Sequence, residues 1–193
     1  PALNAAISRG GPVIPVFIHD DQIAKLGAAL KWRLGLGLEH FAEVLDGKDI
    51  RLILRQGNAL TVLKALIEET GAGAVYWSRL YDPEAVERDT EVKKTLKTKG
   101  IDARSFGGHL MFEPWTVETK TGGFYKVYTP FWRAVDAAGV AEPLPAPATL
   151  PAPARWPASD ALSDWALGRD MNRGSAAVAR YAVVGEEAAR KPR

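Results

Sequence analysis

The stretch AVYWSRLYDPEAVERDTEVKKTLKTKGIDARSF, residues 74–106, decides the fold of this chain. It opens at 74–77 on β-branched and aromatic residues, a run that is typical of a buried strand. The charged, amphipathic residues 84–99 predict a helix that ends at Gly100, and residues 101–106 predict the next strand. Strand, helix and strand in this order indicate a βαβ unit with parallel strands.

The same alternation extends toward the N-terminus. Residues 13–18 and 50–54 are short apolar runs that predict strands, and residues 28–45 and 60–67 carry apolar side chains at helical spacing. The pattern predicts an α/β fold over residues 1–130, a three-layer sandwich around a parallel, Rossmann-like sheet.

Glycines mark two features of this domain. Gly35 and Gly37 lie inside the predicted helix 28–45, where each costs about 1 kcal/mol relative to alanine, so we expect another segment to pack closely there. Residues 2–9 predict the end of a helix that Gly10 and Gly11 stop. We therefore expect the first strand of the sheet to precede this sequence.

The composition changes after the predicted domain. Residues 143–157 hold six prolines among alanine and leucine, which favours an extended arm laid over a surface. Residues 159–162 and 180–189 predict only short helical pieces. We interpret residues 131–193 as an interdomain linker.

Charge and composition exclude several classes of site. The net charge is +2, from 25 basic and 23 acidic residues, which is too small an excess to indicate a nucleic-acid-binding surface. The chain has no cysteine, so disulfides and thiolate metal sites are excluded. No targeting or membrane-spanning run is visible, and we expect a cytoplasmic protein that does not bind membranes.

The candidate site lies where the predicted strands end, because ligands of parallel α/β sheets bind beyond the carboxyl ends of the strands. Those ends are near residues 17–21, 55–58, 78–83 and 107–108. No phosphate-binding loop and no histidine pair at metal-ligand spacing are present.

Two charged or aromatic stretches have alternative readings. The charges of helix 84–94 favour a solvated face, and the alternative is that carboxylates of its first turn contact a ligand. The aromatic residues within 124–133 favour packing of a segment that connects domains, and the alternative is a stacking platform for nucleic acid.

Several stretches together resemble the photolyase and cryptochrome family. The resemblance is carried by residues 1–3 (PAL), 15–20 (PVFIHD), 27–34 (GAALKWRL), 76–83 (YWSRLYDP), 87–89 (ERD), 125–133 (YKVYTPFWR) and 184–189 (VGEEAA). The stretch 125–133 is the most specific of these, since it is similar to the family's Lys-Val-Phe-Thr-Pro-Phe segment.

The resemblance implies a light-driven DNA-repair enzyme, of which this chain is the N-terminal antenna part and its connecting arm. In that family a reduced flavin (FAD), held in a helical C-terminal domain, passes an electron to a flipped-out pyrimidine dimer in damaged DNA. The resemblance thus implies a partner FAD domain, an active full-length protein that is a monomer, and no catalytic residue in this chain. It also implies that the chain alone is inactive.

The resemblance further implies a second, light-harvesting chromophore in this domain. Phe17, Asp20 and Glu87 match by type the positions that contact a deazaflavin, and Arg79 and Tyr81 would line the same crevice. In folate-type members an Asn-Glu or similar pair follows the strand-to-helix crossing. Residues 84–85 (Glu-Ala) stand there instead, which favours the deazaflavin type.

Two alternatives stay open. A cryptochrome photoreceptor has the same fold, and the residues that distinguish it from a photolyase lie in the C-terminal domain. A nucleotide-binding α/β module unrelated to repair is the other, although no strand's carboxyl end carries a glycine-rich phosphate turn.

Overall fold

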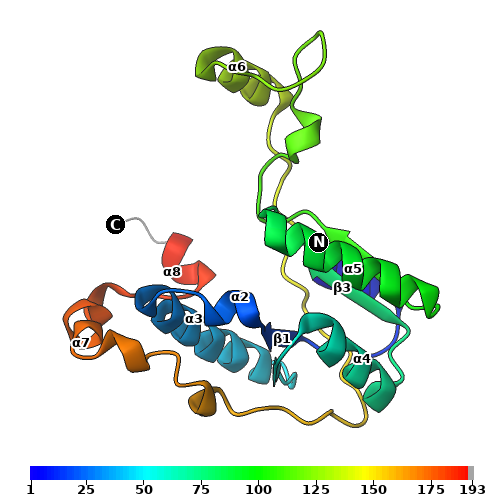
Figure 1. The fold of residues 1–193 in the computed structure, drawn as a ribbon, viewed down its shortest axis with the longest axis vertical. Coiled ribbons are helices and arrows are strands. Elements are labelled where there is room, and N and C mark those ends of the chain that lie inside the picture. The colour runs from blue at the N-terminus through cyan, green and yellow to red at the C-terminus, as the bar shows by residue number, and fades with distance from the viewer. Residues whose placement is uncertain (191–193) are drawn as a thin grey trace. The chain divides into compact units, whose positions relative to one another are not determined.

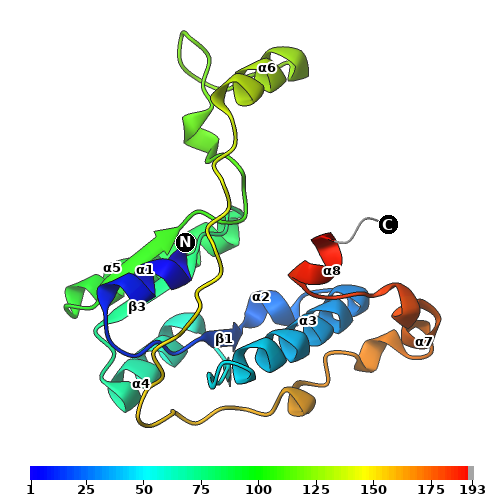
Figure 2. The ribbon, with the colours of Figure 1, turned by 180° about the vertical axis from the view of Figure 1, so that it is seen from behind.

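The computed structural model describes residues 1–190 and divides the chain into two compact units. Unit 1 contains Pro1–Arg9 and Ala74–Ala148, and unit 2 contains Gly10–Gly73 and Thr149–Arg193. Each unit is built from two separate stretches of the chain (Figures 1 and 2).

Unit 1 contains the βαβ unit that residues 74–106 predict. Strand β3 (Ala74–Ser78) is followed by helix α5 (Pro83–Thr98) and strand β4 (Asp102–Phe106), and the two strands pair in parallel with Ala74 opposite Asp102. The helix buries one face, formed by Ala85, Val92 and Leu96. Helix α1 (Ala2–Arg9), which Gly10 ends as predicted, contacts β3.

The ends of α5 follow local signals in the sequence. Asp82 is the N-cap, and its carboxylate accepts a hydrogen bond of 3.0 Å from the backbone N–H of Ala85. Pro83 occupies the first helical turn, where its missing N–H costs nothing. After the helix, Gly100 has φ +76°, a left-handed conformation that glycine adopts without a steric penalty.

The rest of unit 1 has little regular structure. Residues 107–127 contain one short 3₁₀ helix, η1 (Pro114–Thr116), and helix α6 (Tyr128–Ala138) follows. Within α6 Val135 is the buried residue.

Unit 2 contains a second parallel pair of strands. Strand β1 (Val16–His19) pairs with β2 (Ile53–Gln56), with Val16 opposite Ile53. Between them lie the short helix α2 (Asp21–Ala24) and the long helix α3 (Ala28–Asp46), and helix α4 (Ala59–Thr70) follows β2. Ile50 and Ile53 are fully buried.

The α/β class and the parallel pairing of the strands are confirmed. The four strands, however, form two two-stranded sheets rather than one continuous sheet. Backbone hydrogen bonds join β1 to β2 and β3 to β4. Helix α4 lies between β2 and β3 in the sequence.

Residues 149–190, called the arm from here on, pack on unit 2. The proline-rich stretch 143–157 was expected to lie over a surface, and its part from residue 149 onward belongs to this arm. The arm contains the short elements η2 (Leu162–Trp165), η3 (Arg169–Met171), α7 (Gly174–Val178), η4 (Ala179–Tyr181) and α8 (Glu186–Arg190). Its backbone reaches strand β2, where Asp160 N–H donates to the Leu54 carbonyl at 2.9 Å and Leu54 N–H donates to Ser159 Oγ at 2.9 Å. The arm thereby satisfies backbone groups of β2 that a two-stranded ladder leaves open.

Helix α3 explains one of its two glycines. A Cβ added at Gly35 would lie 3.4 Å from Cβ of Leu167 in the arm, so the expected close packing is present there. A Cβ at Gly37 would meet no atom within 4 Å. The packing argument is confirmed for Gly35 and is wrong for Gly37.

Candidate functional site

Arg79 follows the carboxyl end of β3 in unit 1 and is held on several sides. Its backbone N–H donates to the carbonyl of Phe106 at 2.8 Å, and its guanidinium donates to the carbonyl of Ser105 at 3.2 Å. Its Nη1 forms an ion pair with Glu113 Oε2 at 2.8 Å, and its Cζ lies 5.0 Å from the centre of the Trp115 ring. The guanidinium is thus fixed by a carboxylate and an aromatic face.

Tyr81 lies beside the same tryptophan. The two ring centres are 6.5 Å apart with the planes tilted by 42°. The Tyr81 hydroxyl oxygen is closed to solvent and has no hydrogen-bond partner within the described residues. Burial, and then the Glu113 carboxylate, raise the pKa of Tyr81, so the phenol stays protonated and keeps a donor.

Glu87, the third predicted residue of unit 1, lies apart from these contacts. It is exposed on α5, and within residues 1–190 no hydrogen bond or ion pair of its side chain is found. The structure brings Arg79 and Tyr81 together through Trp115, and it does not add Glu87 to that set.

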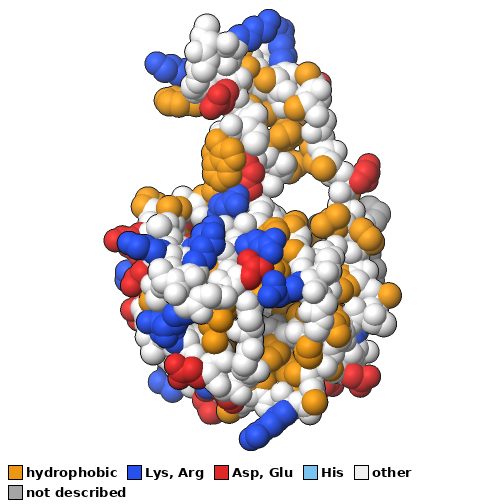
Figure 3. Space-filling view, turned by 90° about the vertical axis from the view of Figure 1, so that its right-hand side faces the viewer, with side chains coloured by type: hydrophobic (Ala, Val, Ile, Leu, Met, Phe, Trp, Pro, Cys, Tyr) orange, Lys and Arg blue, Asp and Glu red, His pale blue; other side chains and the backbone are white. Residues whose placement is uncertain are grey.

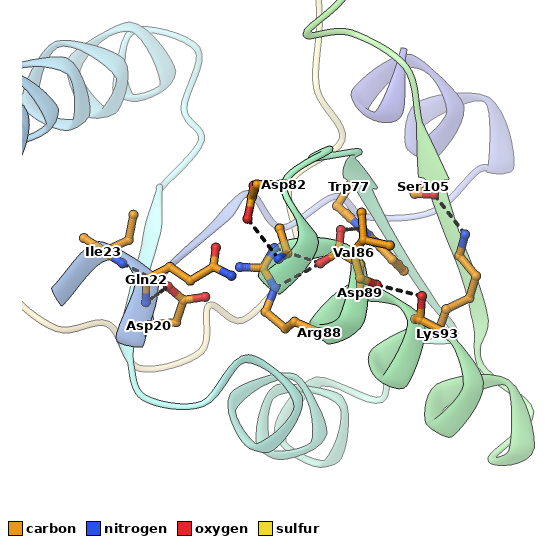
Figure 4. A network of polar contacts seen from close by, with 12 residues as sticks. Asp20, Gln22, Ile23, Trp77, Asp82, Val86, Arg88, Asp89, Lys93 and Ser105 are labelled. Atoms are coloured by element: carbon orange, nitrogen blue, oxygen red, sulfur yellow. Dashed lines mark hydrogen bonds and ion pairs between the residues drawn. The ribbon is translucent and has the colours of Figure 1, made fainter. Parts of the chain in front are cut away.

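The charged helix α5 has one face that is not simply solvated. The Trp77 indole N–H donates to Asp89 Oδ2 at 2.8 Å, and Lys93 Nζ donates to Ser105 Oγ at 2.9 Å (Figure 4). The Lys93 ammonium also lies 5.7 Å from the centre of the Trp77 ring.

The surroundings of Lys93 also shift its pKa. Burial, and then the charges of Arg79 and Lys97, lower the pKa of Lys93. The favoured reading of a solvated face therefore holds for exposed residues such as Glu84 and Glu87, and it is wrong for Asp89 and Lys93.

In unit 2, Phe17 and His19 lie on β1 and share one aromatic neighbour. The ring of Trp165, from the arm, has its centre 6.1 Å from that of Phe17 and 5.1 Å from that of His19. His19 is buried, and it lies at the end of β1 beside Asp20.

Asp20, at the carboxyl end of β1, caps the N-terminus of the next helix. It is the N-cap of α2, and its Oδ1 accepts hydrogen bonds from the backbone N–H groups of Gln22 at 3.1 Å and Ile23 at 3.2 Å (Figure 4). Asp20 is 8% exposed. Its position at a strand end is as expected, and a ligand there would share the carboxylate with the helix cap.

Three aromatic or acidic residues of these clusters were not predicted. Glu113 and Trp115 belong to the irregular segment after β4, and Trp165 belongs to the arm. Neither segment has a helical or strand period, so no pattern indicated which side chains turn toward the strand ends.

Unit 2 also contains a pocket that the sequence did not predict. It has a volume of about 370 Å³ and lies between α3 and the arm, with Trp32, Glu39 and Arg169 in its lining. None of the predicted site residues lines it.

Two classes of feature are not found in the described part of the chain. Within residues 1–190 no group of histidine or acidic side chains is placed to hold a metal ion. No helix among these residues is long and apolar enough to span a bilayer.

Known sequences place the chain among photolyases. A model of the DNA photolyase family matches residues 1–150. A deoxyribodipyrimidine photo-lyase of Agrobacterium fabrum is 44% identical over 167 residues, which are 86% of this chain and 35% of that protein. Cryptochrome-2 of Arabidopsis thaliana is 33% identical over 69% of this chain and 22% of its own length. The chain thus spans about a third or less of the length of these relatives.

Solved structures agree. The crystal structure of a class III photolyase from Agrobacterium tumefaciens has a TM-score of 0.79 at 44% identity, covering 86% of this chain and 35% of that one. An archaeal photolyase from Sulfolobus tokodaii, solved with two FAD molecules, has a TM-score of 0.59 at 25% identity over 78% of this chain and 33% of its own. Sequence and fold agree over most of its length: this chain belongs to the DNA photolyase family.

Proposed function

We propose that this chain is the antenna-bearing N-terminal portion of a deoxyribodipyrimidine photo-lyase, which repairs pyrimidine dimers in DNA with light. The observation that carries the proposal is the 44% identity to a photolyase over 86% of this chain, combined with coverage of only 35% of that relative. The flavin chemistry belongs to a C-terminal FAD portion, with damaged DNA as its substrate.

Within this proposal residues 1–130 are the antenna domain, and residues 131–193 lead to the FAD portion. The full-length enzyme is a cytoplasmic monomer, and the chain alone is inactive. No residue of this chain is assigned to the repair step, because the reacting atoms lie elsewhere.

A cryptochrome photoreceptor is the second candidate. Cryptochrome-2 shares 33% identity over 69% of this chain, which is less on both measures than the Agrobacterium photolyase shares. Because the chain belongs to the DNA photolyase family, the alternative of a nucleotide-binding α/β module unrelated to repair has no remaining support.

The second chromophore is proposed to be a deazaflavin that contacts Phe17, Asp20, Arg79, Tyr81 and Glu87. Two features support it: Tyr81 retains an unpartnered hydroxyl next to Trp115, and Phe17 offers an aromatic ring at a strand end. When bound, the chromophore supplies absorbed light energy to the flavin. The protein's task is to orient a planar ring and to donate hydrogen bonds to its polar edge.

Light absorption tests the function itself. The whole gene product is expected to show oxidised-flavin bands in the near ultraviolet and blue, and this chain is expected to show none of them. A whole product without flavin would contradict the photolyase proposal.

Asp20→Asn tests the chromophore site while keeping the helix cap, because an asparagine oxygen also accepts from the first-turn N–H groups. We expect this variant to weaken deazariboflavin binding to the whole gene product about tenfold, since a charge-assisted hydrogen bond contributes about 1.4 kcal/mol or more. Titration followed by fluorescence gives the affinity.

Asp21→Asn is the matched control, because Asp21 is the next residue in the sequence and its side chain is exposed. Equal affinities for Asp20→Asn and the parent protein, or tighter binding of methenyltetrahydrofolate than of deazariboflavin, would contradict the deazaflavin assignment and leave the photolyase proposal standing.

A further inference from the structure

Exposed apolar side chains of this chain are concentrated in one segment. Of the seventeen large hydrophobic residues that are exposed in the described chain, ten lie between residues 110 and 144. They are Leu110, Met111, Trp115, Phe124, Val127, Tyr128, Phe131, Trp132, Val140 and Leu144. Hydrophobic side chains are visible on this segment in the upper part of Figure 3. Such a concentration marks a surface that binds another macromolecule.

Helix α6 organises this surface into a stripe. Tyr128, Phe131, Trp132 and Val135 occupy positions i, i+3, i+4 and i+7, which lie on one side of a helix. Val135 is 7% exposed, whereas Tyr128 and Trp132 are 70% and 50% exposed. One end of the stripe is covered and its aromatic end is open.

The aromatic end is also ordered before anything binds to it. The rings of Tyr128 and Trp132 stack with centres 6.3 Å apart and planes 16° from parallel. Phe131 packs edge-on against Tyr125 with centres 6.3 Å apart. Rings fixed by one another lose little further freedom on binding, which is a property of aromatic anchors in protein interfaces.

The chemistry of the stripe favours a protein partner over nucleic acid. Within α6 the sequence has one basic residue, Arg133, and one acidic residue, Asp136. A surface that follows a phosphate backbone needs a row of cations as well as stacking rings. The exposed aromatic residues Tyr128, Phe131 and Trp132 of this amphipathic helix instead fit an apolar groove of a protein.

We propose that the aromatic face of α6 (Tyr128, Phe131 and Trp132) is the surface on which the flavin-binding portion of the same protein docks. This rests on the proposed function. The Agrobacterium photolyase is covered over only 35% of its length by this chain, so the relatives carry a large further portion that is available to cover the face. Docking there holds the antenna portion and the flavin portion together.

Hydrogen exchange measured by mass spectrometry tests the docking. Amide exchange in residues 128–135 is compared between this chain and the whole gene product. We expect at least tenfold slower exchange in the whole product, because docking stabilises the helix against local opening. Unchanged exchange would overturn the proposal. Slower exchange of residues 128–135 in this chain at higher protein concentration would also overturn it, because it would indicate that a second copy covers the face. Slower exchange in this chain on addition of a DNA duplex would overturn it as well, because it would indicate a nucleic-acid surface.

The double substitution Tyr128→Ser and Trp132→Ser removes the anchors from positions that are exposed in this chain, so the chain itself is expected to keep its circular dichroism spectrum. In the whole product the variant should lose the protection of residues 128–135. Phe41→Ser is the matched control, since Phe41 is an exposed aromatic residue on helix α3 and should leave the protection intact.

The two proposals fail separately. A whole product that binds flavin but leaves α6 unprotected overturns the docking surface alone. A whole product without flavin overturns the proposed function.

Discussion

At the scale of single residues, Asp102 of unit 1 is a carboxylate with three charged or polar partners. At the start of β4 it accepts hydrogen bonds from the Tyr76 hydroxyl and from Arg104, and it forms an ion pair with Arg9 at 2.9 Å. The Arg104 guanidinium, then the Tyr76 hydroxyl, hold the pKa of Asp102 well below its usual range. The pair Arg9–Asp102 also joins α1 to the strand, although the two residues are 93 positions apart in the sequence.

This cluster predicts how stability depends on pH. A depressed pKa in the folded state contributes stability above the unfolded pKa of about 3.9, and that contribution is lost as the pH falls below it. We therefore expect the melting temperature of Asp102→Asn to fall less steeply between about pH 5 and pH 3 than that of the parent chain.

Melting curves followed by circular dichroism at several pH values measure the effect. Asp136→Asn is the control, because Asp136 is exposed and forms no ion pair in the described residues. Parallel melting-temperature profiles for the parent chain and Asp102→Asn would contradict the role of the cluster.

At the scale of elements, helix α3 is shaped by the arm that packs on it. Leu167 lies against Gly35, and a Cβ added at Gly168 would lie 3.2 Å from Cδ1 of Trp32. The Arg33 guanidinium donates to the carbonyl of Val183 at 2.8 Å. The helix tolerates a glycine at 35 because a side chain of the arm occupies the space beside it.

The two glycines of α3 predict different responses to substitution. Gly37→Ala should raise the free energy of unfolding by about 1 kcal/mol, because it improves helix propensity and meets no neighbour. Gly35→Leu should lower it by about 1–3 kcal/mol, because the larger side chain displaces Leu167.

Urea unfolding of the purified chain measures both changes. Each variant is the other's control, since the two positions lie in the same helix. Similar stability of the two variants would show that Leu167 does not restrict position 35.

At the scale of the whole molecule, two units are each assembled from distant stretches of sequence. Unit 2 takes its strands from residues before 73 and its covering arm from residues after 149. The arm forms hydrogen bonds with Val13, Leu54 and Glu69 of unit 2. Its own residues Leu150, Pro157 and Leu167 are buried. The arm is therefore structural for unit 2.

This arrangement predicts that removal of the arm acts on one unit. In a chain ending at residue 148, the Leu54 amide loses its acceptor, Ser159 Oγ, and should exchange at least tenfold faster than in residues 1–193. Amides of β4, in unit 1, should keep their protection and serve as the internal control.

Exchange of individual amides followed by NMR distinguishes the outcomes. Equal exchange at Leu54 with and without the arm would contradict its structural role. A general loss of protection in both units would show instead that they fold as one cooperative body.

The sequence by itself determined most of the local structure of residues 2–106, whereas helix α6 was not predicted. Strands, helices and caps follow from contacts within a few residues: the apolar run at 74–77, Asp82 before α5, and Gly71, which ends α4 with φ +68°. The α/β class and the parallel pairs follow from the alternation of those elements. The family resemblance rested likewise on short stretches, above all residues 125–133.

Only the tertiary structure decided which side chains meet. Glu113 and Trp115 reach Arg79 from an irregular segment, and Trp165 reaches Phe17 from an arm whose residues follow no period. The same is true of the two separate strand pairs and of the open aromatic face of α6. Such contacts join residues far apart in the chain, and local propensity carries no information about them, because burial and packing depend on the whole fold.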